Sequence, residues 1–199
     1  MSGESESTAL LVIDLQRGLE SPSHGPRNNP DCETNVAALI QTWREKRQPV
    51  VFVRHDSSRP DSLLRPGQPG NDFHPVVDGE PDLLVAKQTS SAFQGDPDLH
   101  AWLQERQVQR VAICGVQTNY CCESTARAAA DLGYDTLFVI DATYTFDLTA
   151  LDGGTIPATE LARVTASTLH GEIADVVTTA DLLSSLTFSP TFVRCVGNA

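Results

Sequence analysis

The sequence lacks the features that mark several large classes of protein. Basic residues are scarce, because 14 Lys and Arg stand against 26 Asp and Glu, and the formal net charge is -12. A surface of this sign argues against a nucleic-acid or anionic-membrane partner. No apolar run approaches the roughly 20 residues that a membrane-spanning helix needs. We therefore expect neither nucleic acid nor membrane among the partners.

The cysteines lack any regular spacing. Their number is odd, and the chain has no C-x-x-C pair, which excludes a zinc knuckle and a thioredoxin motif. Irregular cysteines of this kind fit reduced thiols. The segment 1–8 is polar and acidic, so it does not resemble a signal peptide, and we expect a cytoplasmic protein. The five cysteines are Cys32, Cys114, Cys121, Cys122 and Cys195.

Internal repeats, low-complexity segments and shifts in composition that would mark a domain boundary are also absent. A chain of 199 residues with 40% apolar residues suits one domain with a full core. We assign residues 1–199 to a single domain. Its core is expected at about 8–186, followed by a C-terminal tail at 187–199 with no clear pattern.

Short apolar strands alternate with amphipathic helices along the chain. This alternation predicts an α/β fold, a three-layer sandwich in which a six-stranded parallel sheet carries helices on both faces. The expected strands span 8–14, 49–54, 82–87, 108–114, 135–140 and 173–178. The expected helices span 35–47, 98–107, 119–132, 157–169 and 180–186.

Two connections are unusually long. Residues 16–31 follow the first strand and residues 55–81 follow the second, so both leave from strand carboxyl ends, where open α/β sheets bind ligands. Long loops in compact domains are typically lids or binding loops. Their arginines are either scattered surface residues or include one that recognises a substrate carboxylate. These arginines are Arg17, Arg27, Arg54, Arg59 and Arg65.

The segment from Gly115 to Cys122 is the most informative in the chain. It follows an apolar strand and precedes a helix, so it places Cys121 at a strand-to-helix turn. Backbone N–H groups and the helix dipole favour an anion there, which predicts a lowered thiol pKa and a thiolate nucleophile near neutral pH. Adjacent helical residues point about 100° apart, so we expect Cys121 to face a crevice and Cys122 to pack inside. Cys114 is expected in the core.

Two further reactive groups end strands at the same edge of the predicted sheet. Asp14 ends the first strand and Lys87 ends the third, so both can meet Cys121 in one crevice. Together they supply a base, a cation that favours the thiolate, and a nucleophile. The alternatives are that Asp14 caps a loop, Lys87 is a solvated strand end and Cys121 is a buried structural thiol.

Three motifs in this order resemble the isochorismatase-like cysteine hydrolases. They are the strand into Asp14-Leu15-Gln16, the segment from Lys87 to Phe93, and the segment from Gly115 to Cys121. The resemblance covers about residues 8–186. It implies the strand order 3-2-1-4-5-6 and a catalytic triad of Asp14, Lys87 and Cys121.

The resemblance also implies details of the site. A non-proline cis peptide bond is expected at Val116–Gln117, with the backbone N–H groups of Gln117 and Cys121 forming an oxyanion hole. The substrate pocket is expected to include side chains near the strand ends, although aromatic residues there are often simply core. These pocket residues are Gln16, Phe93, Tyr144 and Phe146.

The resemblance implies hydrolysis of a C–N bond in a small molecule, such as an amide, carbamoyl or lactam bond, through a thioester and without a cofactor. The cysteine argues against vinyl-ether cleavage, because true isochorismatases lack it. Nicotinamidases of the family carry an Asp-x-His metal motif after the second strand. Here that region reads His55-Asp56-Ser57, out of register, so we expect no metal. A homodimer or larger homo-oligomer is also implied.

Two other functions stay open from the sequence. Cys121 and Arg127 match the C-x5-R spacing of phosphatases, but that loop curls around phosphate on glycines. The intervening residues here suit a helix and include Glu123, whose charge repels phosphate. The second alternative is a non-catalytic binding or assembly protein that has kept the fold.

Overall fold

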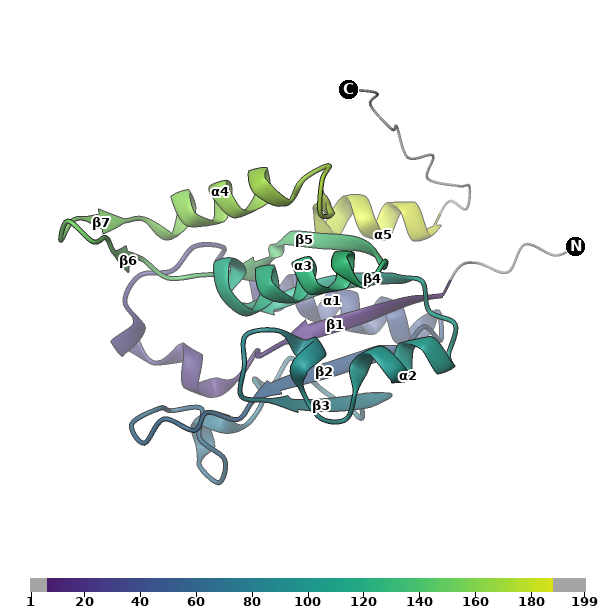
Figure 1. The fold of residues 1–199 in the computed structure, drawn as a ribbon, viewed down its shortest axis with the longest axis horizontal. Coiled ribbons are helices and arrows are strands. Elements are labelled where there is room, and N and C mark those ends of the chain that lie inside the picture. The colour runs from purple at the N-terminus through teal and green to yellow at the C-terminus, as the bar shows by residue number, and fades with distance from the viewer. Residues whose placement is uncertain (1–6, 188–199) are drawn as a thin grey trace, which may run out of the picture.

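The computed structural model describes residues 7–187, whose centre is a six-stranded sheet with helices on both faces (Figure 1). The strand order is β3-β2-β1-β4-β5-β8, and every neighbouring pair is parallel. This order confirms the predicted 3-2-1-4-5-6, because β8 is the sixth strand of the sheet. Of the expected tail at 187–199, only residue 187 lies within the described residues, and Cys195 lies outside them.

The strands and helices have these bounds. The sheet contains β1 (Thr8–Ile13), β2 (Val50–His55), β3 (Leu83–Lys87), β4 (Arg110–Val116), β5 (Asp135–Tyr144) and β8 (Asp175–Val177). The helices are α1 (Cys32–Glu45), α2 (Leu99–Glu105), α3 (Glu123–Asp131), α4 (Ala158–Leu169) and α5 (Thr179–Thr187). A small hairpin of β6 (Leu148–Thr149) and β7 (Thr155–Ile156) projects from one end of the molecule (Figure 1).

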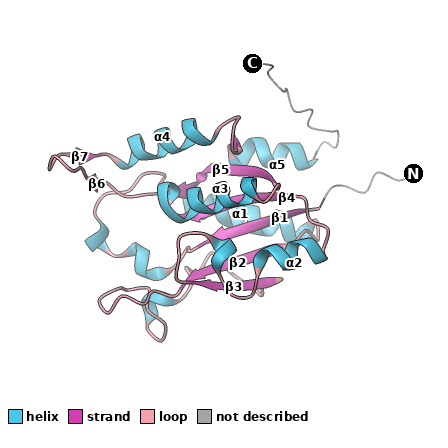
Figure 2. Ribbon diagram, viewed as in Figure 1, coloured by secondary structure: helices cyan, strands magenta, loops and turns pink. Residues whose placement is uncertain are grey.

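The central strand β1 is apolar from Ala9 to Ile13, as expected for a strand with both faces covered by helices (Figure 2). Its side chains alternate between two hydrophobic clusters, one on each face of the sheet. Leu10 and Val12 pack with Trp43 of α1 on one face. Leu11 and Ile13 pack with residues of α2 and α3 on the other. The sheet is therefore held rigidly in the middle layer, which fixes where the strands end.

β5 extends beyond its predicted end at residue 140. The register against β4 shifts between Ile113 and Gly115, because β5 carries extra residues at this point. The side-chain Nδ2 of Asn29 donates hydrogen bonds to the carbonyls of Ile140 and Thr143, at 2.9 and 2.6 Å. These bonds let β5 continue through its polar residues to Tyr144, which pairs with Val116 of β4.

The two long loops contact each other at the carboxyl edge of the sheet. Gln16 forms a β-bridge with Phe73, and the backbone N–H of His74 donates to the carbonyl of Leu15 at 2.9 Å. The loops contain short 3-10 turns at Arg17–Glu20, Pro22–His24 and Pro69–Asn71. They therefore cover this edge as one connected layer.

Among residues 7–187, no helix has the length and apolar character needed to cross a bilayer.

Gly115 of β4 pairs with Ile13 of β1. Its φ is +117°, and a Cβ there would lie 2.0 Å from the carbonyl oxygen of Ile13. We expect Gly115→Ala to lower the free energy of unfolding by about 3 kcal/mol, because the clash with backbone adds to the strained φ.

The matched control is Gly133→Ala, at a φ of +87° with no atom within 4 Å of the added Cβ. This change should cost only about 1 kcal/mol. Denaturant unfolding of both variants measures the difference, and equal losses would contradict the close approach at Gly115.

Candidate active site

Asp14 is the first residue after β1. Its backbone has a φ of +46°, and its N–H donates to the carbonyl of Val53 at 2.9 Å. Aspartate tolerates this left-handed conformation better than most residues. The turn directs the carboxylate to the carboxyl edge of the sheet, where the residue is only 2% exposed.

Lys87 ends β3 and is equally buried, so it is not a solvated strand end. Its Nζ donates to Asp14 Oδ2 at 2.6 Å, to the Thr89 carbonyl at 3.1 Å and to His55 Nδ1 at 3.3 Å. An ammonium has three N–H groups, so these three acceptors use all of them. Lys87 is one of only two lysines in the chain, and its charge is fixed in place.

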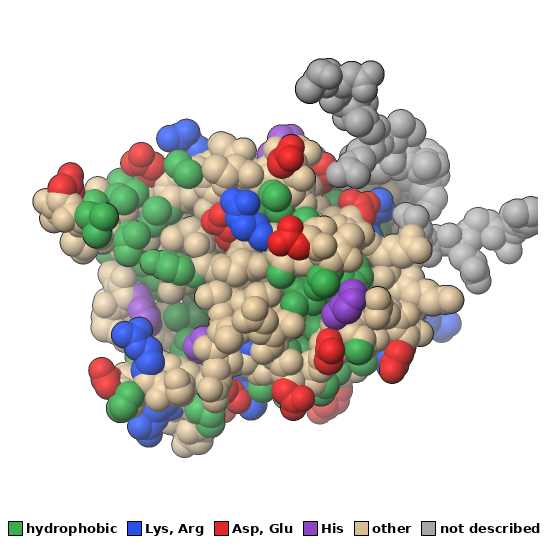
Figure 3. Space-filling view, in the orientation of Figure 1, with side chains coloured by type: hydrophobic (Ala, Val, Ile, Leu, Met, Phe, Trp, Pro, Cys, Tyr) green, Lys and Arg blue, Asp and Glu red, His purple; other side chains and the backbone are tan. Residues whose placement is uncertain are grey.

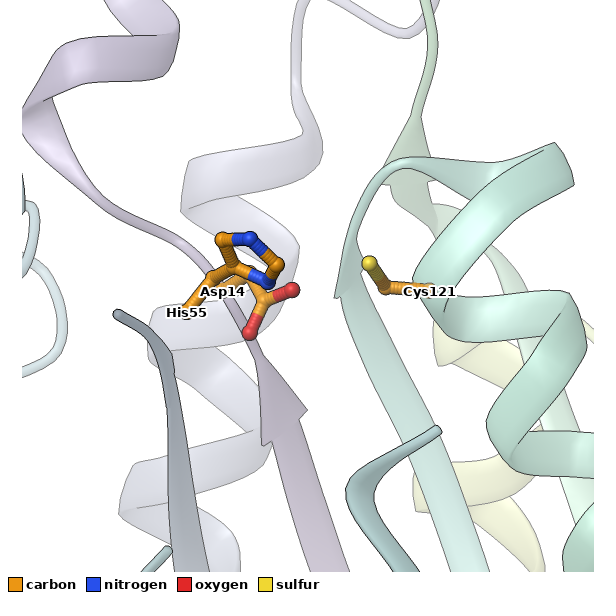
Figure 4. A group of neighbouring side chains, drawn as sticks. All are labelled: Asp14, His55 and Cys121. Atoms are coloured by element: carbon orange, nitrogen blue, oxygen red, sulfur yellow. The ribbon is translucent and has the colours of Figure 1, made fainter. Parts of the chain in front are cut away.

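Asp14 keeps one carboxylate oxygen free for other chemistry. Its Oδ1 is buried and has no hydrogen-bond partner within residues 7–187. One carboxylate oxygen of Asp14, one ring nitrogen of His55 and the sulfur of Cys121 all lie within 4.8 Å of one another. Figure 4 shows the Cys121 sulfur pointing towards the Asp14 carboxylate. The structure thus brings together the three predicted groups, Asp14, Lys87 and Cys121.

Cys121 lies in a single π-helical turn, Thr118–Cys122, that precedes α3. The N–H of Cys122 donates to the Gln117 carbonyl at 3.2 Å, which closes this wider turn. The predicted helix from residue 119 therefore begins as a π turn, a form that often occurs at functional sites. Cys121 is partly exposed, whereas Cys122 is fully buried in the core.

The predicted low pKa of the nucleophile is wrong for this structure. Burial, reinforced by the nearby Asp14 carboxylate, raises the pKa of Cys121 to about 12, and Lys87 only partly opposes this. Removal from water outweighs the helix-terminus effect on which the prediction depended. The side chain is consequently a thiol at rest, and it needs a base to become a nucleophile.

The charges of the buried pair are set by burial and by each other. Burial raises the pKa of Asp14 above 3.8, and Lys87 acts in the opposite direction. Burial disfavours the Lys87 ammonium, but the attraction of Asp14 and Cys121 outweighs it and raises the pKa of Lys87. Asp14 is therefore a stronger base than an exposed aspartate, and Lys87 stays protonated.

The turn before Cys121 contains the predicted cis peptide bond, Val116–Gln117. The Thr145 hydroxyl is close to two side chains of this turn, at 2.5 Å from Asn119 Oδ1 and 3.4 Å from Gln117 Oε1. The turn is thus tied to the end of β5. The assignment of the Gln117 and Cys121 N–H groups as the oxyanion hole stays a prediction.

The four predicted pocket residues have other neighbours in the structure. Tyr144 is fully buried, with Phe146 against its ring at a centroid distance of 5.5 Å. Phe93 stacks on Tyr134 at 5.7 Å. The Gln16 amide, in the first loop, bonds to backbone groups of His55 and Asn71, in the second loop. Gln16 therefore clamps the loops, and a substrate contact by any of the four stays a prediction.

His55 belongs to the site, and the sequence analysis missed it as a partner of Lys87. The register between β2 and β3 places His55 directly beside Lys87. The signal was available, because His55 ends the second strand just as Asp14 and Lys87 end the first and third. The sequence analysis uses His55 only in comparison with a metal motif.

The residues do not fit a resident metal ion. Asp14, His55 and Cys121 could offer one donor atom each, but the Lys87 ammonium is bonded to two of these side chains and would repel a cation. Asp56 is not free either, because its carboxylate accepts hydrogen bonds from Arg54 and Asn71. The expectation of a metal-free site stays a prediction.

Two of the five loop arginines are engaged with acids of the chain. Arg27 forms hydrogen bonds of 2.5 and 2.8 Å to Glu33, and Arg54 forms bonds of 2.7 and 3.0 Å to Asp56. Arg27 also lies 4.1 Å from the centre of the Tyr144 ring. These pairs leave Arg27 and Arg54 poorly suited to recognise a substrate carboxylate.

A family model described as the isochorismatase domain matches residues 8–167. The isochorismatase family protein YrdC of Bacillus subtilis is 30% identical over 90% of this chain and 96% of its own length. Nicotinamidase 3 of Arabidopsis thaliana is 33% identical over 72% of this chain and 76% of its own. A streptothricin hydrolase of Streptomyces noursei is 29% identical over 83% of this chain and 60% of its own.

Solved structures agree with the sequence matches. A protein described as a hydrolase of the isochorismatase family from Chromobacterium violaceum has a TM-score of 0.87 and 38% identity, over 94% of this chain and 97% of its own. A cysteine hydrolase from Pseudomonas syringae has a TM-score of 0.78 and 25% identity, over 89% of this chain and 91% of its own.

Proposed function

Because this chain belongs to the isochorismatase family of hydrolases, we propose that it cleaves a C–N bond of a small molecule with Cys121 as nucleophile. The bond is an amide, carbamoyl or lactam bond. Relatives named nicotinamidase and streptothricin hydrolase support this class. A cysteine hydrolase among the structural neighbours supports the choice of nucleophile.

The observation that carries this proposal is that the two oxygens of Asp14 have different surroundings. Oδ2 accepts a hydrogen bond from Lys87, while Oδ1 is buried and has no partner within residues 7–187, and the carboxylate lies close to Cys121. A base with a raised pKa beside a thiol is the arrangement that proton transfer needs. The nucleophile is then formed only during the attack.

The first half of the reaction forms a thioester. Asp14 Oδ1 takes the proton from the Cys121 thiol as Sγ attacks the carbonyl carbon of the substrate. The N–H groups of Gln117 and Cys121 donate to the oxyanion, an interaction worth about 3 kcal/mol in comparable sites. The C–N bond then breaks, and Asp14 returns the proton to the leaving nitrogen.

The second half releases the acid. Asp14 takes a proton from water while the water oxygen attacks the thioester carbon. The C–S bond breaks, and the proton passes from Asp14 to Sγ. Lys87 stays charged throughout both halves and balances the Asp14 carboxylate whenever Asp14 is unprotonated. The acid product, the amine and the resting thiol account for every atom.

The phosphatase alternative loses support in the structure. Arg127 lies on α3, and its guanidinium donates to Glu123 Oε1 at 3.0 and 2.8 Å. Its side chain is 42% exposed, and the carboxylate beside it disfavours phosphate.

A non-catalytic role is tested by the experiment below. A small-molecule substrate, a homo-oligomeric state and a cytoplasmic location are further parts of the proposal.

The test is ammonia or amine release from a panel of small amides, carbamoyl compounds and lactams, with and without EDTA. Mass spectrometry of the quenched enzyme should find an acyl group on the peptide that contains Cys121. We expect equal rates with and without the chelator. If aryl phosphate were hydrolysed while no amide was, the proposed function would be wrong.

A further inference from the structure

The backbone of His55 is held from both sides by the long loops. Its N–H donates to Gln16 Oε1 at 2.9 Å, and its carbonyl accepts from Gln16 Nε2 at 3.2 Å and from Asn71 Nδ2 at 3.1 Å. Gln16 and Asn71 are both buried. The strand register sets His55 beside Lys87. His55 is therefore held by Gln16 of the first loop, by Asn71 of the second loop and by its pairing with β3.

The contact with Lys87 fixes the tautomer of the ring. An ammonium can only donate a hydrogen bond, so His55 Nδ1, 3.3 Å from Lys87 Nζ, is the acceptor. The ring proton is then on Nε2. In this arrangement Lys87 has one acceptor for each N–H: Asp14 Oδ2, the Thr89 carbonyl and His55 Nδ1.

We propose that His55 is a positioning residue that holds the Lys87 ammonium on Oδ2 of Asp14 and so keeps Oδ1 available to the Cys121 thiol. This inference depends on the proposed function. Without the third acceptor, one N–H of a buried ammonium loses its partner, which is costly. Asp14 Oδ1, the other oxygen of the carboxylate that Lys87 already contacts, is an acceptor without a partner among residues 7–187. Lys87 would then bridge both carboxylate oxygens and weaken the base.

Charges around His55 keep its ring neutral at neutral pH. Burial and the Lys87 ammonium lower the pKa of His55 below 6.5, while Asp14 and Asp56 act in the opposite direction. Cys121, the other titratable group nearby, is a thiol at rest. Protonation of His55 would place a second cation against Lys87. Activity should therefore fall as the pH drops through the pKa of His55, in the range below 6.5.

The first experiment compares three variants by kcat, KM and pH profile. His55→Leu removes the acceptor, and we expect kcat to fall about 100-fold with little change in KM, because His55 acts through Lys87. His55→Asn offers an amide oxygen near the Nδ1 position that does not titrate. It should recover most of kcat and move the acid limb to lower pH. The matched control, His100→Asn, changes a residue that contacts Tyr134 instead and should match the wild type.

The second experiment measures alkylation of Cys121 by iodoacetamide as a function of pH, mapped by peptide mass spectrometry. In His55→Leu the ammonium moves towards Oδ1 and the sulfur, so the thiolate is stabilised. Alkylation near neutral pH should therefore become faster while hydrolysis becomes slower. A merely structural loss would not separate the two rates in this way.

Two results would overturn the role of His55. One is a wild-type kcat and alkylation profile in His55→Leu, and the other is identical behaviour of His55→Asn and His55→Leu. Failure of the proposed function is a different result, namely no turnover of any amide by the wild-type protein. In that case the alkylation profiles still decide whether His55 positions Lys87.

Discussion

Replacing Cys121 by alanine is expected to lower kcat by about 10⁵-fold, to the background rate. The change removes the proposed nucleophile, and no other cysteine within residues 7–187 is exposed, because Cys32, Cys114 and Cys122 are fully buried. The fold should survive, since Cys121 is partly exposed. Steady-state kinetics, together with the loss of the acyl adduct, measure the effect.

The control for Cys121→Ala is the same change at the adjacent residue. Cys122 packs in the core and points away from the crevice, so Cys122→Ala should keep kcat within a few-fold of the wild type and lose about 1 kcal/mol of stability. A Cys121→Ala protein that still hydrolyses the substrate and carries the acyl group on Cys122 would reverse the assignment.

Replacing Lys87 by methionine should remove both activity and much of the stability. The change leaves the Asp14 carboxylate buried without its 2.6 Å partner. Breaking a buried ion pair from one side costs about 3–5 kcal/mol. The unpaired carboxylate would take up a proton and lose its function as a base. Denaturant unfolding and kcat at pH 7 measure the two losses.

A double variant separates the two effects. Asp14→Asn combined with Lys87→Met removes both charges, and such neutral replacements often restore the stability that a single change loses. We therefore expect a folded protein, within about 1–2 kcal/mol of the wild type, that has no hydrolase activity. Recovery of turnover in the double variant would show that the pair is structural and not catalytic.

The positions of the candidate catalytic groups could be predicted because they depend on strand ends. A buried parallel strand is recognisable from its continuous apolar run, and all such strands end at one edge of the sheet. Asp14 and Lys87 directly follow or end such runs, so their meeting with Cys121 needed no knowledge of the loops. The strand order needed the family resemblance, because apolar patterns do not say which strands are neighbours.

Features that depend on tertiary contacts could not be predicted. β5 continues through the polar residues Asp141 and Thr143 because Asn29 caps carbonyls in its bulge. The pKa of Cys121 depends on how completely the loops exclude water, which no local pattern records. Strands β6 and β7 are only two residues each, too short for an alternating pattern to show.

The β6–β7 hairpin exposes hydrophobic side chains to solvent. Leu148 and Leu151 are both exposed there, the latter completely, and hydrophobic side chains gather over this end of the molecule in Figure 3. The homo-oligomer expected from the family resemblance stays a prediction. Light scattering of the wild type and of Leu151→Asp would show whether this end takes part in self-association.

The joining of the two loops through Gln16 has a consequence for engineering. Its amide bonds to His55 at the start of the second loop and to the carbonyl of Asn71 further along that loop. A chimera that imports one loop from a relative would break these bonds and loosen the crevice. Transplanting substrate preference between relatives of this chain therefore requires exchanging both loops together.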